Sequence, residues 1–203
     1  MNFFLIILCS YLIGSLSASY FLGKFNGINV KQSGSGNLGA SNTVVLMGWK
    51  AGIFVAAHDI LKAVVATLAV GYFFKDVAYA REIAGVSCVI GHIFPFYLKF
   101  SGGKGFASYI GMILALNFNL ALGIVVMIAV LTITTDYIAV ATLSTVIVVP
   151  LYMAFISRNF VSALILSIAS IVMVFKHLEN IKRIINGTEI GLRSANKGNY
   201  RKK

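Results

Sequence analysis

Residues 105–135 read GFASYIGMILALNFNLALGIVVMIAVLTITT, and this long apolar run decides how many times the chain crosses a membrane. A membrane helix needs about 20 mostly apolar residues, so the run is long for a single helix. Asn117, Phe118 and Asn119 offer a break in its middle. We therefore predict a short helix at 105–116 and a helix of ordinary length at 120–135.

The composition places the chain among integral membrane proteins. Hydrophobic residues make up 59% of the sequence and charged residues only 11%, whereas an ordinary soluble domain carries about 25% charged residues. The net charge is +11, but the basic residues stand at the ends of apolar runs, as in the cytoplasmic loops of membrane proteins. This pattern does not indicate nucleic-acid binding. The predicted fold is all-α, a single membrane domain over residues 1–203.

The remaining apolar runs complete a bundle of seven predicted transmembrane helices, one of them short. The first run lacks a basic start and is predicted to be a retained span rather than a signal peptide. The five further spans are predicted at 3–23, 51–74, 83–98, 136–156 and 160–176.

The distribution of charge sets the predicted orientation. One side of the seven-span bundle keeps Lys75, Arg81 and Arg158, while Lys62 lies within a span. The other side holds the remaining basic residues, which are Lys24, Lys31, Lys50, Lys99, Lys104, Lys176, Lys182, Arg183, Arg193, Lys197, Arg201, Lys202 and Lys203. The positive-inside rule then places the N-terminus outside and the C-terminus in the cytoplasm. The predicted cytoplasmic segments are 24–50, 97–104 and 177–203.

The first polar segment on the cytoplasmic side is 33–42, SGSGNLGASN. Gly34 to Gly39 spell GxGxxG, but this pattern indicates a dinucleotide site only within a βαβ unit, and here a membrane helix precedes it. Glycines still let backbone N–H groups approach an anion, and a following helix N-terminus adds partial positive charge. We predict a phosphate-binding loop with Ser41 and Asn42 capping the helix. A flexible loop before a capped helix is the alternative.

The second segment is 91–108, GHIFPFYLKFSGGKGFAS. It is not a Walker motif, because Gly105 rather than Ser or Thr follows Lys104. Glycines and a lysine at a helix start nevertheless suit a phosphate. A helix of this predicted length rises about 18 Å, less than the roughly 30 Å hydrocarbon core, so we expect it to start inside the membrane. Lys104 is either a ligand or an interface anchor, and His92 either a ligand or a structural histidine.

The third segment is 176–189, KHLENIKRIINGTE, which leaves the last span. His177, Glu179 and Asn180 stand where this span meets the cytoplasm, although a solvated tail would also look like this. No cysteine and histidine cluster has the spacing of metal ligands, and we expect neither a metal nor a cofactor.

A polar cluster interrupts the second predicted span. Intramembrane charges are expensive and usually face the bundle interior. Asp59 and Lys62 are three residues apart on one helical face, with His58 beside them. We favour an internal ion pair between Asp59 and Lys62 that supports the site. The alternative is that these residues take part in the reaction.

Together and in this order, the three segments resemble the bacterial acyl-phosphate-dependent glycerol-3-phosphate acyltransferases, the PlsY family. The family motifs run approximately SGNxGATN…R, GHxFPxFLxFKGGKG and HRENIxRLxxGxE. This sequence supplies SGNLGASN, GHIFPFYLKFSGGKG and HLENIKRIINGTE. The resemblance implies an enzyme of phospholipid biosynthesis in the bacterial cytoplasmic (inner) membrane, with its active site facing the cytoplasm. By the same resemblance, the enzyme is expected to transfer a fatty acyl group from acyl phosphate to the sn-1 hydroxyl of glycerol-3-phosphate, giving lysophosphatidic acid and phosphate.

The resemblance also implies roles for residues. Catalytic roles fall to Ser35, Lys104, His177 and Asn180. The substrate phosphates would be bound by Gly36, Asn37, Gly39, Ser41, Asn42, His92, Gly102, Gly103 and Gly105. Glu179 would brace its segment, as Asp59 and Lys62 would brace theirs. His177 is the best protein candidate for a general base, and the substrate's own phosphate is the alternative. The implied partners are the two substrates and membrane lipid, with no nucleic acid; a peripheral enzyme that forms acyl phosphate is a further candidate.

The sequence departs from the family pattern at cationic positions. Val45, Ser101 and Leu178 stand where the family usually has Arg, Lys and Arg, and Ser41 replaces a threonine. A charge-assisted hydrogen bond contributes roughly 1.5–3 kcal/mol. Nearby cations such as Lys31, Lys50, Lys99 or Arg183 would compensate, or the chain is a divergent paralogue with another acceptor. A non-catalytic lipid-binding or transport protein is the third interpretation.

Overall fold

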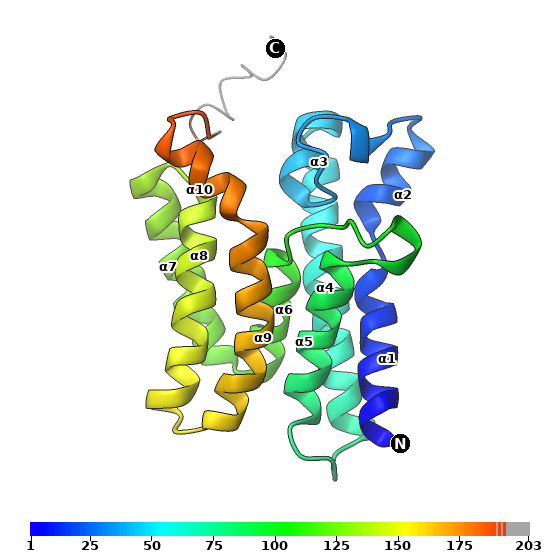
Figure 1. Cartoon of the computed structure of the whole chain (residues 1–203), viewed down its shortest axis with the longest axis vertical. Coiled ribbons are helices and arrows are strands. Elements are labelled where there is room, and N and C mark those ends of the chain that lie inside the picture. The colour runs from blue at the N-terminus through cyan, green and yellow to red at the C-terminus, as the bar shows by residue number, and fades with distance from the viewer. Residues whose placement is uncertain (190, 192, 194–203) are drawn as a thin grey trace. The chain divides into compact units, whose positions relative to one another are not determined.

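Helices make up all the regular structure of the described chain. The computed structural model describes residues 1–189, 191 and 193, and these residues contain no strand. The prediction of an all-α protein is therefore confirmed for this part of the chain. The chain divides into two compact units, Met1–Phe118 and Asn119–Lys203, and each is described by itself. Figure 1 shows the order of the helices in each unit.

The first unit contains six α-helices and two short 3₁₀ helices. In chain order they are α1 (Asn2–Ser15), α2 (Ala18–Phe25), η1 (Val30–Gln32), α3 (Ala40–Met47), α4 (Trp49–Phe73), α5 (Ala80–Ile93), η2 (Phe96–Leu98) and α6 (Phe106–Leu116). The second unit continues with α7 (Phe118–Thr135), α8 (Ile138–Leu151), the π-helix η3 (Tyr152–Ile156), α9 (Phe160–Lys176) and α10 (Leu178–Ile185).

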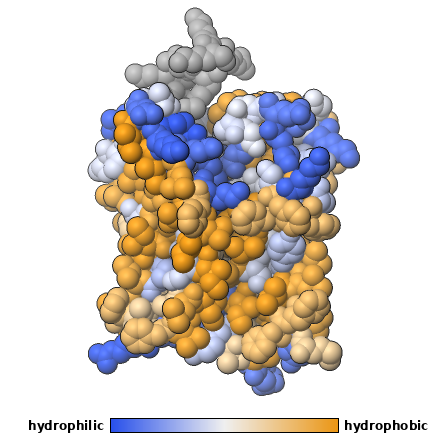
Figure 2. Space-filling model, viewed as in Figure 1, coloured by the Kyte–Doolittle hydropathy of each residue, from blue (hydrophilic) through white to orange (hydrophobic). Residues whose placement is uncertain are grey.

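Several helices are long and apolar enough to cross a membrane. Four candidates meet this test among the described residues, namely Asn2–Phe25, Trp49–Phe73, Phe118–Thr135 and Ile138–Ile156. A fifth is α9 taken together with α10, which is bent from it by 45°. Figure 2 shows hydrophobic side chains over the middles of the helices and hydrophilic ones near their ends. This distribution is typical of a membrane protein.

The apolar run at 105–135 is broken at Asn117, as predicted. Helix α6 ends at Leu116 and α7 begins at Phe118, with Asn117 between them in an extended conformation. The short helix of the prediction is therefore present, at Phe106–Leu116.

Other boundaries differ from the prediction. The first predicted span, 3–23, is divided between α1 and α2, and α7 begins at Phe118 rather than at 120. Helix α5 covers Ala80–Ile93 rather than 83–98, because Pro95 disfavours helical geometry at the residue before it. The segment before the second predicted span is not a plain loop, since it holds the separate helix α3. Gly48, with a φ of 83°, separates α3 from α4, and glycine adopts this left-handed conformation without strain.

Small residues let the helices of the first unit approach closely. Helix α1 packs against α5, and α4 packs against α5 and α6. A Cβ atom on Gly14 would overlap the backbone of Cys88, and one on Gly91 would overlap the backbone of Tyr11. Gly111 of α6 lies equally close to the backbone of α4. Such contacts replace hydrophobic burial as a source of packing energy between membrane helices.

Candidate active site

The first glycine segment is a compact loop fixed by one buried asparagine. Gly34 and Gly36 have φ values of 60° and 69°, which favour glycine. The Asn42 side chain reaches back into the loop, where its Oδ1 accepts a hydrogen bond of 2.9 Å from the backbone N–H of Ser35. Its Nδ2 donates to the carbonyl of Ser33 at 3.1 Å. Because Asn42 is only 3% exposed, these bonds are shielded from water.

The predicted capping of the next helix is wrong. Helix α3 begins at Ala40, its N-cap is Gly39, and this residue makes no side-chain cap. Ser41 and Asn42 therefore lie inside the first turn, and Asn42 bonds the loop instead. An uncapped N-terminus carries backbone N–H groups without intrahelical partners, which is the arrangement that binds an anion.

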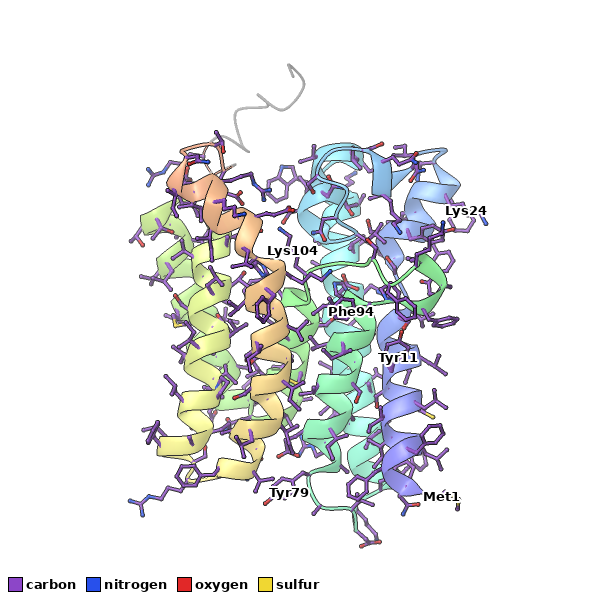
Figure 3. All side chains as sticks on the ribbon, viewed as in Figure 1. Met1, Tyr11, Lys24, Tyr79, Phe94 and Lys104 are labelled. Atoms are coloured by element: carbon purple, nitrogen blue, oxygen red, sulfur yellow. The ribbon has the colours of Figure 1, made fainter. Side chains whose placement is uncertain are left out.

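The second glycine segment folds back along the end of α5. The N–H groups of Gly102 and Gly103 donate to the carbonyls of Ile93 and His92, at 3.0 and 3.2 Å. Gly105, with a φ of 93°, is the N-cap of α6 and again makes no side-chain cap. Lys104 lies immediately before this helix start (Figure 3). The second loop thus also ends at an uncapped helix N-terminus.

Contacts within the first unit join the two loops. The Lys31 ammonium donates to the carbonyl of Leu98 at 2.7 Å. Val30, just before the first segment, and Leu38 within it form a buried cluster with Leu98 of the second segment. We call the joined segments, residues 30–42 and 98–105, the glycine-loop pair. Its two uncapped helix starts are held by one apolar cluster.

Aromatic residues anchor the second loop to the break between α1 and α2. The Tyr97 hydroxyl donates to the carbonyl of Ser15 at 2.9 Å and accepts from the N–H of Ser17 at 3.2 Å. The Tyr11 hydroxyl donates to the carbonyl of Phe94 at 2.7 Å, and Figure 3 labels both residues. The break in the first span therefore supplies backbone groups that fix the loop.

A buried polar cluster lies beneath the second loop. The predicted ion pair is present, with Lys62 Nζ 2.8 Å from Asp59 Oδ1. His58 Nδ1 lies 3.4 Å and His92 Nδ1 3.3 Å from the same oxygen. Asp59, Lys62 and His92 are each less than 10% exposed.

The third segment forms the junction of α9 and α10 in the second unit. His177 stands between the two helices and is 5% exposed. Its Nδ1 lies 2.8 Å from the carbonyl oxygen of Met173. A carbonyl only accepts, so Nδ1 carries the proton and Nε2 is the basic nitrogen of the neutral ring. This tautomer suits a general base.

The residue that orders Asn180 is Glu189. Asn180 Nδ2 donates to Glu189 Oε1 at 2.5 Å, and Arg183 Nε donates to Glu189 Oε2 at 2.6 Å. Glu179, in contrast, has a side chain 83% exposed and lies 3.8 Å from Arg183. Gly187, with a φ of 66°, turns the chain back so that Glu189 reaches Asn180. Sequence reasoning missed Glu189, although it closes the motif HLENIKRIINGTE.

The residues predicted for the site fall into two groups. The glycine-loop pair and the cluster beneath it bring together Ser35, Gly36, Asn37, Gly39, Ser41, Asn42, Asp59, Lys62, His92, Gly102, Gly103, Lys104 and Gly105. The second unit carries His177, Glu179 and Asn180. The Ser35 side chain is exposed, and its hydroxyl makes no hydrogen bond to any described residue.

The positions that lack the family's cations are all exposed. They are Val45, Ser101 and Leu178. Of the predicted replacements, Lys31 bonds the second loop and Arg183 bonds Glu189. Lys197, Arg201, Lys202 and Lys203, which entered the charge count, lie outside the described residues.

Curated relatives share most of the length of this chain. It is 38% identical to the "Glycerol-3-phosphate acyltransferase 1" of Oceanobacillus iheyensis, covering 92% of this chain and 93% of the relative. It is also 38% identical to the "Glycerol-3-phosphate acyltransferase" of Bacillus subtilis, with 91% and 95% covered.

Two solved structures share the fold of this chain. Two crystal structures match, both of PlsY (YgiH), described as an integral membrane glycerol 3-phosphate acyltransferase. The glycerol 3-phosphate form has a TM-score of 0.87 at 26% identity and covers 95% of this chain and 96% of that one. The lysophosphatidic acid form has a TM-score of 0.85 at the same identity, covering 96% and 97%.

A family model agrees with these likenesses. The model described as "Glycerol-3-phosphate acyltransferase" matches residues 4–187, which include all three polar segments. The chain belongs to the glycerol-3-phosphate acyltransferase family.

Proposed function

We propose that the protein transfers a fatty acyl group from acyl phosphate to the sn-1 hydroxyl of glycerol-3-phosphate, releasing lysophosphatidic acid and phosphate. The observation that carries the proposal is the glycine-loop pair, in which two uncapped helix starts stand in one unit. Both proposed substrates carry a phosphate, and helix N-termini bind phosphates through backbone N–H groups. The family and the names of the relatives support the acceptor.

The proposed topology has seven spans, with the N-terminus outside and the tail in the cytoplasm. The chain then lies in the bacterial cytoplasmic membrane as one membrane domain. All three polar segments face the cytoplasm, from which glycerol-3-phosphate arrives. Helices α5 and α6 complete the seven spans although both are short. A peripheral enzyme that forms acyl phosphate is the expected supplier of the donor.

The glycine loops and Lys104 bind and position the phosphate groups. Acyl phosphate is a mixed anhydride with a good leaving group, so no covalent intermediate on the protein is required. Backbone N–H groups and the Lys104 ammonium stabilise the charge on the phosphate and on the developing oxyanion. The Ser35 hydroxyl is a further donor to a phosphate oxygen, with Asn37 beside it. Holding both substrates in reacting geometry supplies the rest of the acceleration.

His177 takes the proton in the proposed reaction. The acceptor hydroxyl gives its proton to His177 Nε2 while its oxygen attacks the carbonyl carbon of acyl phosphate. The bond from that carbon to the phosphate oxygen breaks, and phosphate leaves with the electron pair. Asn180, held by Glu189, orients glycerol-3-phosphate. The substrate's own phosphate is the alternative base.

The test is acyl transfer by the purified protein in detergent, with palmitoyl phosphate and glycerol-3-phosphate as substrates and acyl-CoA as the comparison donor. We expect lysophosphatidic acid and phosphate from acyl phosphate only. The variants Ser35→Ala and Lys104→Ala should fold and lose turnover. If the wild type forms no product with glycerol-3-phosphate but acylates another polyol phosphate, the neutral residues Val45, Ser101 and Leu178 mark an altered acceptor. Full activity in both variants would contradict the assigned site.

A further inference from the structure

The buried lysine of α4 has a complete set of hydrogen-bond acceptors. Lys62 Nζ lies 2.8 Å from Asp59 Oδ1, 2.7 Å from the carbonyl oxygen of Leu16 and 3.1 Å from His92 Nδ1. An ammonium group has three N–H donors and no acceptor. Each donor therefore has one acceptor, provided that His92 Nδ1 accepts.

This requirement fixes the tautomer of His92. His92 Nδ1 has two polar neighbours, Asp59 Oδ1 at 3.3 Å and Lys62 Nζ at 3.1 Å, and of these two contacts the one with Lys62 has hydrogen-bond geometry. If Nδ1 carried a proton, two donors would face each other at the contact with Lys62, and one N–H of a buried ammonium would lack an acceptor. Leaving such a group unsatisfied costs about 1–3 kcal/mol or more for a charge. An accepting Nδ1 avoids this cost. The proton of the neutral ring then resides on Nε2.

The Nε2 end of the ring faces the second glycine loop. A Cβ atom on Gly103 would overlap His92 Nε2, so this nitrogen lies directly against the Gly103 backbone. Nε2 has no hydrogen-bond partner within the described part of the chain, although His92 is only 7% exposed. Lys104 and the helix start at Gly105 follow directly in the chain.

We propose that Lys62 is a positioning residue, which holds His92 as a neutral ring whose Nε2–H donates to a phosphate oxygen of the substrate at Gly103–Gly105. Asp59 and the carbonyl of Leu16 hold Lys62 in turn. The inference rests on the proposed function for the identity of the phosphate, but the tautomer of His92 stands on the hydrogen bonds alone. The glycine loop supplies backbone N–H donors, and His92 adds its Nε2–H, which Lys62 holds in place.

The first experiment is ¹⁵N NMR of the histidine-labelled full chain in detergent micelles at neutral pH. Comparison with His92→Asn assigns the His92 signals among those of the three histidines. We expect Nδ1 in the range of an unprotonated ring nitrogen and Nε2 in that of a protonated one. A protonated Nδ1 would overturn the inference, whatever the enzyme activity. Titration with inorganic phosphate should shift the Nε2 signal in the wild type.

The second experiment removes the lysine. In Lys62→Met we expect the Nδ1 signal to move toward a mixture of tautomers, and kcat/KM to fall at least about tenfold, as when other outer supports of a site are lost. Lys75→Met is the matched control, because Lys75 is exposed and follows the other end of α4. The control should leave both readouts unchanged. Unchanged kinetics and tautomer in Lys62→Met would contradict the proposal.

A double variant separates positioning from charge balance. Lys62→Met alone leaves Asp59 without its lysine, which is expensive for a buried charge. Asp59→Asn/Lys62→Met removes both charges at nearly constant volume, so the fold should survive. We expect it to stay as slow as the single variant, because His92 is still not held. Recovery of wild-type kcat/KM in the double variant would assign Lys62 to charge balance instead. A wild type without transferase activity would refute the proposed function, while the NMR result still decides the tautomer.

Discussion

The glycine-loop pair and the α9–α10 junction are polar segments of one family motif set, but they are ordered by different means. In the loop pair, glycines with positive φ and uncapped helix starts define the geometry, and the side chains of Asn42 and Lys31 bond backbone groups. At the junction, side chains bond side chains, as Glu189 does with Asn180 and Arg183. The first region presents backbone N–H donors beside the side chains of Ser35 and Lys104, whereas the second presents the side chains of His177 and Asn180.

This difference suits the two regions to different tasks, namely phosphate recognition and proton transfer. A backbone cradle recognises a charged group of fixed shape, and its geometry depends on the glycines that form it. A proton transfer needs one nitrogen in one tautomer, so it depends on one side chain and its support. We therefore expect substitutions at the junction to lower turnover, and substitutions of the loop glycines to act through shape.

The largest expected effect is that of His177→Ala. Removing a general base costs about 10²–10⁴-fold in rate, so kcat for acyl transfer should fall into that range without loss of fold. The rate is measured with palmitoyl phosphate and glycerol-3-phosphate, and the fold by size-exclusion chromatography and circular dichroism. A folded His177→Ala with wild-type kcat would assign the role of base to the substrate phosphate. The α9–α10 junction would then not carry the proton transfer that distinguishes it from the glycine-loop pair.

The next effect is that of Gly103→Ala. The new methyl group overlaps His92 Nε2, and such overpacking costs about 1–3 kcal/mol, so both thermal stability and activity should fall. Gly123→Ala is the matched control, because a Cβ atom there meets nothing within 4 Å. The thermal midpoint and initial rate of both variants check the prediction. Equal effects at the two glycines would show that shape does not matter in the loop.

Glu189→Gln tests the support of Asn180. The substitution leaves an amide nitrogen where one carboxylate oxygen accepted a bond, and the loss of a charge-assisted hydrogen bond costs roughly 1.5–3 kcal/mol. The KM for glycerol-3-phosphate should rise. Glu179→Gln should have a smaller effect, because an exposed pair contributes only about 0–1 kcal/mol. If Glu179→Gln raises KM more than Glu189→Gln, the ordering residue is Glu179, as the sequence suggested.

The smallest effect is expected for Val45→Arg. This exposed position of α3 is one where the family usually carries arginine, and an exposed ionic contact contributes up to about 1 kcal/mol. The KM for glycerol-3-phosphate should fall a few-fold, by initial-rate measurement. Val161→Arg, on α9, is the comparison for added charge alone. An equal change in both variants would mean that the missing arginine is unrelated to the substrate.

The sequence predicted what depends on local composition. Asn117 interrupts an apolar run, and an interruption of this kind is visible without the fold. The pairing of Asp59 with Lys62 follows from helical spacing. Both features are present in the structure.

Other features depend on contacts between distant residues. The partners of Asn42 lie seven or more positions earlier in the chain, whereas the local sequence favours a helix cap at this residue. The start of α3 at Ala40 was hidden because apolar residues continue through Gly48 into α4. Glu189 reaches Asn180 only through the turn at Gly187. These arrangements have no periodicity that a sequence pattern could reveal.

The shortness of α6 has a consequence for how an acyl chain reaches the chemistry. Its 11 residues rise about 16 Å, roughly half the thickness of the hydrocarbon core. In the proposed topology the loop at its head therefore lies below the membrane surface, and the soluble substrate descends to it. Each methylene left in the lipid keeps about 0.8 kcal/mol of hydrophobic transfer energy. The fatty chain thus reacts without being extracted from the bilayer. The free-energy cost of bringing the two substrates together is then that of moving the polar glycerol-3-phosphate below the membrane surface.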